Sequence, residues 1–396
     1  MDKVYKDSLE LHQKQHGKME IKSKVPLHTK QDLSLAYTPG VGQVSIEIGK
    51  DKELAKIYTL KANTVAVISD GSSILGLGNL GAEAAIPVME GKAILFKEFA
   101  NVDAFPICLA TQNTEEIINI VKQIAPVFGV VNLEDIAAPR CFEIEERLRA
   151  ELDIPVMHDD QHGTATVVLA ALINAIKIHP RHTNILPSTP LRTSQNVGML
   201  GGVKIVMSGA GAAGTAIMKL LLRYGFKDIV VCDTQGAIHK ERPNLTEEKF
   251  EIAELTNPRD VAGSLAEVLV EADVFIGVSK AGLMTNEMVK TMADKPIIFA
   301  LANPVPEIMP DVAKDAGAFI VATGRSDFPN QINNVLAFPG IFRGALDNKI
   351  KQFNDDMFLA AAKALAAYVQ NPTPDQLLPS PLDKGVVKVV ASAIKE

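Results

Sequence analysis

The sequence has few of the features that mark secreted, membrane or nucleic-acid-binding proteins. Aromatic residues make up only 5% of its 396 residues, and no low-complexity tract or obvious repeat is present. No apolar run approaches the roughly 20 residues that span a bilayer, and the opening stretch MDKVYKDSLELHQKQHGK lacks the apolar core of a secretion signal. These absences argue against disorder and a membrane anchor and predict a folded, cytoplasmic protein.

Cysteines are also scarce, and basic residues are not concentrated. Cys108, Cys141 and Cys232 show none of the paired spacings of a zinc site or a disulfide framework, so we expect reduced thiols in the core. The 40 basic and 47 acidic residues give a net charge of −7, without a dense run of Lys or Arg. We therefore expect no nucleic-acid partner, and small molecules are the expected ligands.

What the sequence does contain is the alternation of strands and helices that is typical of a large α/β protein. Its length favours two domains. Short apolar runs predict buried parallel strands separated by helices: NTVAVISDG, ADVFIGVS, PIIFALANP and AFIVATG. TATVVLAALINAIKI predicts a long apolar helix, and the Pro- and Thr-rich residues 179–202 that follow it predict a loop.

The pattern G-x-G-x-x-G occurs twice, and only the second occurrence has the context of a nucleotide site. Gly209, Gly211 and Gly214 follow the strand VKIVM and open a helix, and Asp233 ends the next strand 19 residues after the last glycine. Such a βαβ unit binds pyrophosphate at the helix start and ribose through the acid. Asp233 favours NAD over NADP, because DTQGA offers no cation for a 2′-phosphate. The alternative is a tight turn that only packs the helix on the strand.

The first occurrence, Gly76, Gly78 and Gly81 in LGLGNLG, is interpreted as a positioning loop. It is separated from its strand by a loop, and Pro87 is expected to interrupt the helix that a nucleotide site requires.

Pairs of acidic residues follow two predicted strands. Glu134 and Asp135 come after VFGVVNL, and Asp159 and Asp160 come after IPVMH, with a predicted surface helix between the pairs. If the strands are parallel, four carboxylates meet at one edge of the sheet. A bound Mg²⁺ or Mn²⁺ would relieve their repulsion. The alternative is that the acids are helix caps and first-turn charges.

Taken together, these motifs resemble the malic enzyme family. The blocks that resemble the family's signatures, in family order over about residues 30–345, are AYTPGVG, DGSSILGLGNLG, IPVMEGKAILF, NLEDIAAP, HDDQHGTA, SGAGAAG, FALANPVPE and NQINNVLAFPG. The resemblance implies an α/β fold with an N-terminal catalytic and metal domain over residues 1–160. It also implies a Rossmann-type NAD(P)-binding domain with a mostly parallel sheet over residues 161–396, whose C-terminal helices pack back toward the first domain.

The resemblance further implies an activity and an assembly. The activity is the oxidative decarboxylation of L-malate to pyruvate and CO₂, with NAD or NADP as oxidant and Mg²⁺ or Mn²⁺ as metal. The assembly is a homodimer or a higher homo-oligomer. In this chemistry a base takes the C2 hydroxyl proton as hydride leaves, the metal polarises the ketone, and an acid protonates C3.

Individual roles follow from the same resemblance. It implies Tyr37 as general acid, which also contacts substrate, and Lys92 as general base, with Asp159 orienting or tuning the lysine. The implied metal ligands are Glu134, Asp135 and Asp160. The implied substrate-binding amides are Asn303, Asn333 and Asn334, of which Asn303 is also assigned to the cofactor. From spacing alone, Tyr37 would be a turn residue and Lys92 a solvated helix lysine.

Two questions stay open at the level of sequence. Ser72 and Ser73 stand where longer family members carry an arginine that clamps a substrate carboxylate, so the motif does not say what holds that carboxylate. Two other functions also compete with the first: a malolactic-type lyase that keeps NAD bound and ends at lactate, and a non-catalytic nucleotide-sensing module. Tyr37, Lys92 and the acids argue against the sensor, whereas the motifs do not separate the lyase.

Overall fold

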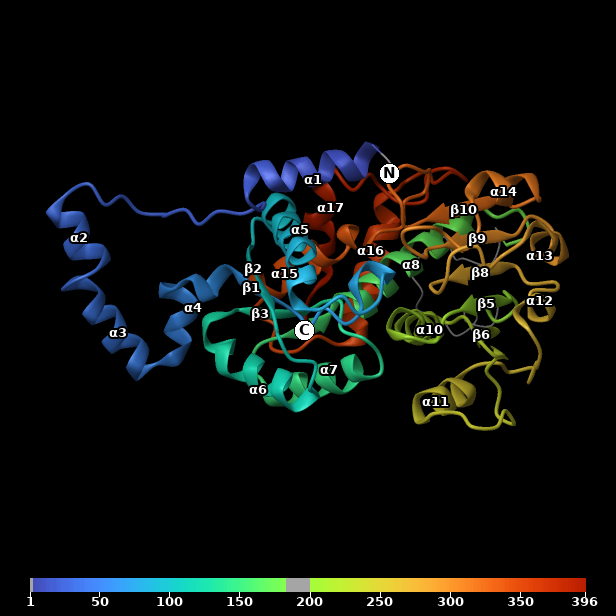
Figure 1. Ribbon diagram of the computed structural model, residues 1–396, viewed down its shortest axis with the longest axis horizontal. Coiled ribbons are helices and arrows are strands. Elements are labelled where there is room, and N and C mark those ends of the chain that lie inside the picture. Colours follow the sequence, from blue (N-terminus) through green and yellow to red (C-terminus); the bar gives the residue numbers. More distant parts are fainter. Residues whose placement is uncertain (1–2, 183–199) are drawn as a thin grey trace.

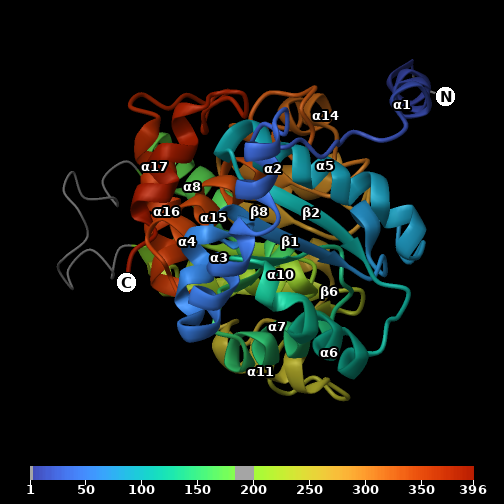
Figure 2. The same ribbon diagram turned by 90° about the vertical axis from the view of Figure 1, so that its left-hand side faces the viewer.

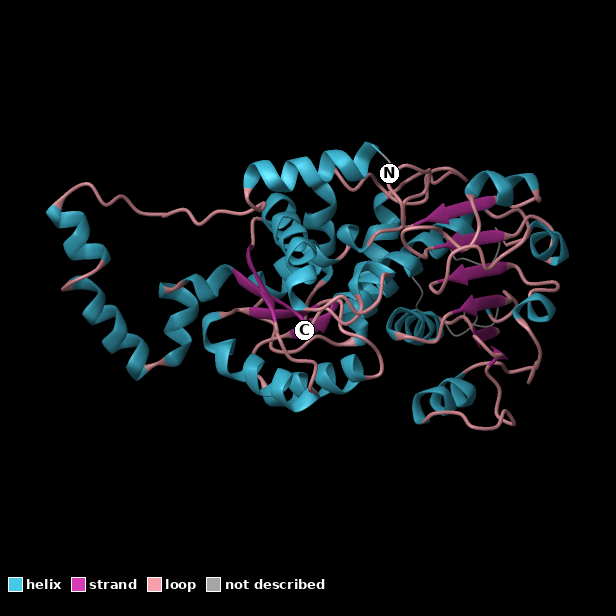
Figure 3. Ribbon diagram, viewed as in Figure 1, coloured by secondary structure: helices cyan, strands magenta, loops and turns pink. Residues whose placement is uncertain are grey.

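A computed structural model describes residues 3–182 and 200–396, and these form an α/β protein with two separate sheets (Figure 1). Figure 3 shows helices surrounding both groups of strands. The predicted loop over 179–202 falls for the most part, at residues 183–199, outside the described residues. Helices and strands alternate along most of the chain, which confirms the predicted fold class.

The first sheet consists of parallel strands in the order β2-β1-β3-β4. Its strands are β1 (Thr64–Ser69), β2 (Asp103–Cys108), β3 (Val130–Leu133) and β4 (Val156–His158). All residues of β1, β3 and β4 are buried, because helices cover both faces of a parallel sheet. The parallel pairing of β3 with β4 confirms the βαβ unit expected around the two acidic pairs.

Three helices cover this sheet. On one face lies α5 (Ala82–Ala100), and on the other lie α6 (Thr114–Ile124) and α7 (Arg140–Glu151). Pro87 does not interrupt α5, so that expectation was wrong. The proline stands near the start of the helix, where it removes only the hydrogen bond to the Glu83 carbonyl, and the turns that follow it stay helical.

The second sheet has the order β10-β9-β8-β5-β6-β7, with only the short β7 antiparallel. Its strands are β5 (Ile205–Ser208), β6 (Ile229–Asp233), β7 (Gly236–Ala237), β8 (Val274–Gly277), β9 (Ile297–Ala300) and β10 (Ile320–Thr323). The helices associated with it are α10 (Ala212–Tyr224), α11 (Glu247–Leu255), α12 (Leu265–Val268), α13 (Asn286–Thr291) and α14 (Pro310–Asp315). This mostly parallel sheet confirms the predicted Rossmann-type arrangement.

The helix α8 (Asp159–Ile178) connects the two sheets through the core. It begins directly after β4 and packs against α10 and against α16 (Asp355–Tyr368) (Figure 1). The helix α16 packs in turn against α17 (Gly385–Ala393), which packs against α15 (Phe338–Asp347). The predicted boundary between the two domains, at residue 160, falls in the first turn of α8. Because α8 runs continuously across this position, the two-domain division stays a prediction.

An aromatic cluster joins α15 to the first sheet. The ring of Phe96 on α5 lies 4.7 Å from that of Phe338 and 5.1 Å from that of Phe342, both in edge-to-face contact. These residues belong to one apolar core that includes side chains from both sheets. The two walls of any site between the sheets are therefore held by a shared core.

The N-terminal helices pack differently. They are α1 (Lys3–Gln15), α2 (Lys30–Ala36), α3 (Gly40–Lys50) and α4 (Ala55–Tyr58), and none of them contains a buried residue. We call residues 30–58 the N-terminal arm, which stands away from the body in Figure 1 and crosses in front of it in Figure 2. Exposed apolar side chains on the arm include Leu33, Leu35, Val41, Ile46 and Ile57.

Short 3₁₀ turns occur at η1 (Lys52–Leu54), η2 (Leu60–Asn63), η3 (Ile74–Gly76), η4 (Ala125–Val127) and η5 (Asn334–Leu336). Within residues 3–182 and 200–396, no helix combines the length and the apolar character needed to cross a membrane.

One buried amide ties α8 to the C-terminal region, which generates a stability prediction. Asn174 donates hydrogen bonds to the carbonyl oxygens of Ala366 at 2.9 Å and Leu377 at 2.8 Å. Asn174→Ala leaves both buried oxygens without these donors, so we expect the free energy of unfolding to fall by about 2 kcal/mol in urea titrations. Gln370→Ala removes an exposed hydrogen bond to Ala367 and should change it by less than about 0.5 kcal/mol. Equal effects would contradict the prediction.

Candidate functional site

A cleft of about 910 Å³ lies between the carboxyl ends of strands from both sheets. One wall comes from α5 and from the loops after β1, β3 and β4, and the other comes from the loops after β5, β8, β9 and β10. Open α/β sheets bind their ligands at this edge. The sequence-predicted site residues that line the cleft are Lys92, Glu134, Asp135, Asp160, Gly211, Gly214, Asn303, Asn333 and Asn334.

Lys92 is buried between two carboxylates. The residue is only 7% exposed, and its Nζ lies 2.9 Å from Oε1 of Glu134 and 2.6 Å from Oδ2 of Asp159. Burial lowers the pKa of Lys92, but the charges of Asp159 and Glu134 outweigh burial and raise the pKa above its ordinary value. Lys92 is therefore an ammonium ion in this arrangement, and it is not the solvated helix lysine that spacing alone suggests.

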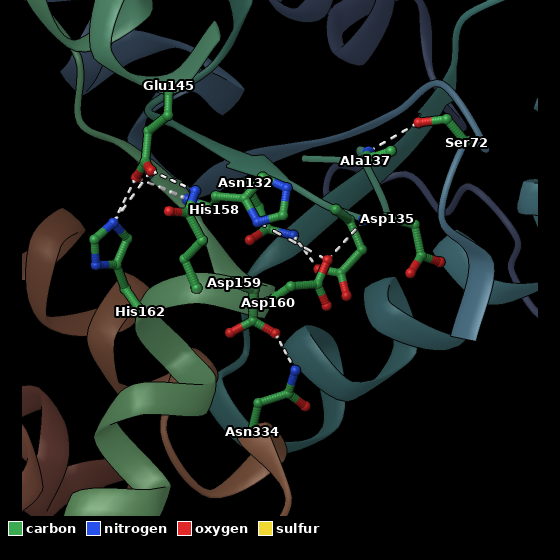
Figure 4. Close-up of polar contacts among 12 residues, drawn as sticks. Ser72, Asn132, Asp135, Ala137, Glu145, His158, Asp159, Asp160, His162 and Asn334 are labelled. Atoms are coloured by element: carbon green, nitrogen blue, oxygen red, sulfur yellow. Dashed lines mark hydrogen bonds and ion pairs between the residues drawn. The ribbon is translucent and has the colours of Figure 1, made fainter. Parts of the chain in front are cut away.

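Asp159 connects the lysine to a cleft amide. Its Oδ2 also accepts a hydrogen bond of 2.6 Å from Nδ2 of Asn334 (Figure 4). A Cβ on Gly163, one turn further along α8, would lie 1.8 Å from Oδ1 of Asp159, so the glycine makes room for the carboxylate. Burial raises the pKa of Asp159 to about 6. Because Asp159 lies in the first turn of α8, the alternative of a first-turn charge also holds for it.

Strand register brings the two acidic pairs together. The last residues of β3 and β4 pair with each other in the parallel ladder, so Glu134 and Asp159 leave the sheet side by side. Asp160 then accepts a hydrogen bond of 2.9 Å from the backbone N–H of Asp135. Asp135 has a φ of 53°, a left-handed conformation that is uncommon for residues other than glycine and is frequent at functional sites.

The acids fit a divalent cation in charge and in ligand type, although they are not arranged around one. In the part of the chain that the structure describes, no three His, Cys, Asp or Glu side chains form a ready metal site. The reason is that Glu134 faces Lys92, while Asp160 faces a backbone N–H. Burial, together with the charge of Asp160, raises the pKa of Glu134 and Asp135, that of Asp135 to about 8. Mg²⁺ or Mn²⁺ would supply the missing positive charge to these oxygen ligands.

Glu145 fixes the junction between β4 and α8, and the sequence analysis missed it. Its carboxylate, on α7, accepts hydrogen bonds from the backbone N–H of His158 at 3.0 Å and from Gln161 at 2.9 Å. Nε2 of His162 lies 2.9 Å from Oε1 of Glu145 (Figure 4). This imidazole therefore faces Glu145 and not the acidic pairs that follow β3 and β4. Glu145 belongs to a helix predicted to lie on the surface, and no local pattern marks it as buried.

The second glycine motif forms the turn between β5 and α10. A Cβ on Gly214 would lie 1.9 Å from the carbonyl oxygen of Gly209, whereas Gly211 faces open space. Gly211 is also the N-cap residue of α10 and makes no side-chain capping bond. The first-turn N–H groups are therefore available to an anion, which fits the pyrophosphate of a dinucleotide.

Asp233 ends β6 and is in contact with two cations. Arg242 Nη2 and Lys249 Nζ each lie 2.7 Å from Oδ2 of Asp233. Burial raises the pKa of Asp233, but hydrogen bonds from Arg242 and Lys249 outweigh burial and lower the pKa to about 2. The expectation that no cation lies here was wrong, because Arg242 comes from a later loop and Lys249 from α11, beyond the local sequence DTQGA.

The three asparagines have different surroundings in the cleft. The carbonyl oxygen of Asn303 would lie 2.7 Å from a Cβ on Gly76, so the first glycine motif packs closely against the Asn303 loop. Oδ1 of Asn333 accepts a hydrogen bond of 3.0 Å from the backbone N–H of Val335 and thereby caps η5. Asn334 is bound to Asp159, as described above.

The two serines in the first glycine loop also differ. Ser72 Oγ donates to Asp70 at 2.5 Å and accepts from the backbone N–H of Ala137 at 2.9 Å, so the fold uses its hydroxyl. Ser73 lines the cleft and is the serine of this pair that a ligand can reach.

Tyr37 does not join the other predicted residues. It is the C-cap residue of α2 on the N-terminal arm, is 64% exposed, and does not line the cleft. The cleft of a single chain therefore contains Lys92 but not Tyr37, the general acid that the resemblance implies.

The fold and this cleft define an α/β protein with two sheets, in which a Rossmann-type nucleotide-binding unit faces a buried lysine and a group of acids. The family description "Malic enzyme, N-terminal domain" matches residues 16–149, and "Malic enzyme, NAD binding domain" matches residues 161–394. The chain belongs to the malic enzyme family.

Individual relatives agree with this assignment. The chain is 54% identical to the bifunctional malic/malolactic enzyme of Bacillus subtilis, over 98% of this chain and 91% of that protein. It is 54% identical to the NAD-dependent malic enzyme of Geobacillus stearothermophilus, over 96% of this chain and 76% of that protein. The crystal structure of the NAD-dependent malic enzyme of Thermotoga maritima superimposes with a TM-score of 0.91 at 48% identity, covering 98% of each chain.

The protonation of Asp135 generates a prediction for metal binding. With a pKa of about 8 it is largely protonated at pH 7 in the metal-free protein, and the ion must displace that proton. We therefore expect the affinity for Mn²⁺ to rise about tenfold per pH unit from pH 6 to 7 and to level off above pH 8. Calorimetry in two buffers of different ionisation enthalpy measures the proton release.

Asp160→Asn provides the matched variant. It should weaken Mn²⁺ binding more than NAD binding, and it should also reduce the proton release, because the charge of Asp160 helps to raise the pKa of Asp135. An affinity for Mn²⁺ that does not change between pH 6 and 8, or a variant with the wild-type Mn²⁺ midpoint, would contradict this assignment.

Proposed function

We propose that this protein catalyses the oxidative decarboxylation of L-malate to pyruvate and CO₂ with reduction of NAD(P)⁺. The observation that carries the proposal is a buried lysine, paired with Glu134 and Asp159, in a cleft whose opposite wall is the glycine turn of a nucleotide-binding unit. Membership of the malic enzyme family supports the same reaction.

Lys92 is the proposed base, and Asp159 holds it in place. As an ammonium ion it cannot accept a proton, so its pKa has to fall before the reaction starts. Glu134, Asp135 and Asp160 would hold a divalent ion, which would supply Lewis-acid polarisation of the C2 oxygen of the substrate. Such an ion would also compensate the charge of Glu134, one of the anions that raise the pKa of Lys92, and would so favour the neutral amine that takes the C2 hydroxyl proton.

The amides and one serine are the proposed ligands of the substrate carboxylates. Asn303, Asn333 and Asn334 line the cleft together with Ser73, and their N–H and O–H groups can donate to carboxylate oxygens. Asn334 already donates to Asp159, which would place bound substrate close to the base. This arrangement would replace the arginine clamp that is missing from the first glycine loop.

NAD is the proposed preferred oxidant, although the reason is weaker than the sequence suggested. The ionised Asp233 stands where a 2′-phosphate would come, at the end of β6. Arg242 and Lys249 offset its charge. We therefore propose that NADP is used with lower affinity and is not excluded.

Tyr37 is the proposed acid, supplied by a second copy of the chain in a homodimer. The arm that carries Tyr37 has no buried residue in α2 or α3, and its exposed apolar side chains would be covered by a partner. The proposal requires that each arm of a two-fold dimer extends to the cleft of the other chain. Both clefts would then contain a base from one chain and an acid from the other.

A malolactic outcome is the second candidate, because one similar protein is named a bifunctional malic/malolactic enzyme. In that reaction NAD is reduced and then reoxidised on the protein, so lactate forms without net NADH.

The products and one variant test the proposed reaction. With L-malate, Mn²⁺ and NAD⁺ we expect equal amounts of NADH, CO₂ and pyruvate, with a higher KM for NADP⁺.

Lys92→Ala should lower kcat at least about 100-fold because it removes the base. Lys97→Ala, which removes an exposed lysine from the same helix, is the control and should leave kcat unchanged. Lactate without net NADH would favour the malolactic reaction. Full activity of Lys92→Ala would exclude Lys92 as the base, and NAD⁺ binding without any turnover in the wild type would favour a nucleotide sensor.

Complementation tests the origin of Tyr37. Tyr37→Phe and Lys92→Ala should each be inactive as homodimers. If the acid acts across the dimer, a randomly reassorted equimolar mixture contains heterodimers with one intact site and recovers about a quarter of the wild-type activity. Co-expression with two different affinity tags provides the mixture. No recovery in purified heterodimers would place Tyr37 and Lys92 of the same chain in one site.

A further inference from the structure

Glu307 is a fully buried carboxylate that the proposed reaction does not use. It belongs to the loop that follows β9 and is 0% exposed. One of its oxygens accepts a hydrogen bond of 3.0 Å from the backbone N–H of Ser279, and the other accepts one of 3.0 Å from the backbone N–H of Ala302. The side chain thus joins the loop after β8 to the loop after β9.

The first of these loops lies against the nucleotide turn. Ser279 Oγ is 2.9 Å from Oγ of Ser208, the residue that precedes the glycine motif. A Cβ on Gly209 would lie 2.8 Å from the carbonyl oxygen of Val278, so the two turns are in close contact. The loop whose N–H group donates to Glu307 is therefore in direct contact with the turn at which a dinucleotide would bind.

The second loop carries a cleft amide. Ala302, the other donor to Glu307, directly precedes Asn303, and both Ser279 and Asn303 line the cleft. The two oxygens of one rigid carboxylate group therefore link the Ser279 loop to the residue next to Asn303. Asn303 is a proposed substrate ligand, and the family resemblance also implies that it contacts the cofactor.

The residues around Glu307 leave room for its side chain between the two loops. A Cβ on Gly277, at the end of β8, would lie 2.4 Å from Cδ of Glu307, so glycine is needed there to admit the side chain. Backbone hydrogen bonds from Gly282 to Pro306 at 3.1 Å and from Met284 to Glu307 at 3.0 Å already fasten the loops together further out. Structural fastening alone does not require a buried carboxylate, whose burial carries a desolvation cost.

We propose that Glu307 is a positioning residue that couples the dinucleotide site to Asn303, so that binding of cofactor and binding of malate favour each other. The proposal rests on the proposed function, because it takes the cleft to bind both molecules. Glutamine at this position keeps the shape but replaces one acceptor oxygen by an NH₂ group, which faces an N–H donor. One of the two hydrogen bonds that link the loops through this side chain is then lost.

The test measures coupling without turnover. NADH and malate form a complex that cannot react, so NADH fluorescence reports the nucleotide affinity with and without saturating malate, in Mn²⁺ buffer. For the wild type we expect malate to tighten NADH binding about fivefold or more. Glu307→Gln should reduce this factor to about 1 while changing the affinity for NADH alone by less than about threefold.

Asp273→Asn is the matched control. Asp273 is also a buried carboxylate that accepts a backbone N–H, from Lys204 at 2.9 Å, but it lies just before β8, at the opposite end of that strand. Asp273 also faces Arg181 and His182. We expect both variants to lower the melting temperature, and Asp273→Asn to keep the wild-type coupling. Coupling retained in Glu307→Gln, coupling lost equally in Asp273→Asn, or no coupling in a wild type that binds both ligands would overturn the proposal. A wild type that does not bind NADH at all would overturn the proposed function together with it.

Discussion

The structure of the site depends on one buried ammonium ion, Lys92, and the two carboxylates that surround it. Removing a lysine and two acids from water is costly, and the pairing repays that cost only if all three groups stay within hydrogen-bonding distance. Each group comes from a different element: α5, the loop after β3, and α8. This constraint fixes the relative positions of these elements. It also explains why position 163, next to Asp159, requires a glycine.

The same crowding of charge prepares the site for chemistry. Four acids and one lysine leave net negative charge in a buried place, which raises the pKa of Asp135 and holds Lys92 protonated. A cation at the acids would correct both effects at once, because it compensates the carboxylates and weakens their hold on the lysine. The crowding of carboxylates around Lys92 thus gives a physical reason for a base that depends on a metal ion.

The second wall of the cleft is organised by backbone geometry more than by charge. The glycine turn needs residues without a Cβ at Gly209 and Gly214, and the loops after β8 and β9 are joined through Glu307. The helix α8 begins at the acids and runs through the core to the C-terminal helices, so both walls share one apolar interior. The N-terminal helices α1, α2 and α3 contribute no buried residue to that interior.

The sequence by itself determined the features that depend on local pattern: the parallel strands, the nucleotide turn, and the acids that follow β3 and β4. Parallel strands place their carboxyl ends at one edge, so the meeting of the acidic pairs could be predicted without coordinates. Tertiary structure alone decided which charges meet across long stretches of chain, such as Arg242 and Lys249 at Asp233, and which acids are buried, such as Glu145 and Glu307. It also decided that Tyr37 lies apart from Lys92. These outcomes depend on packing between segments that are distant in sequence, and no local periodicity encodes such packing.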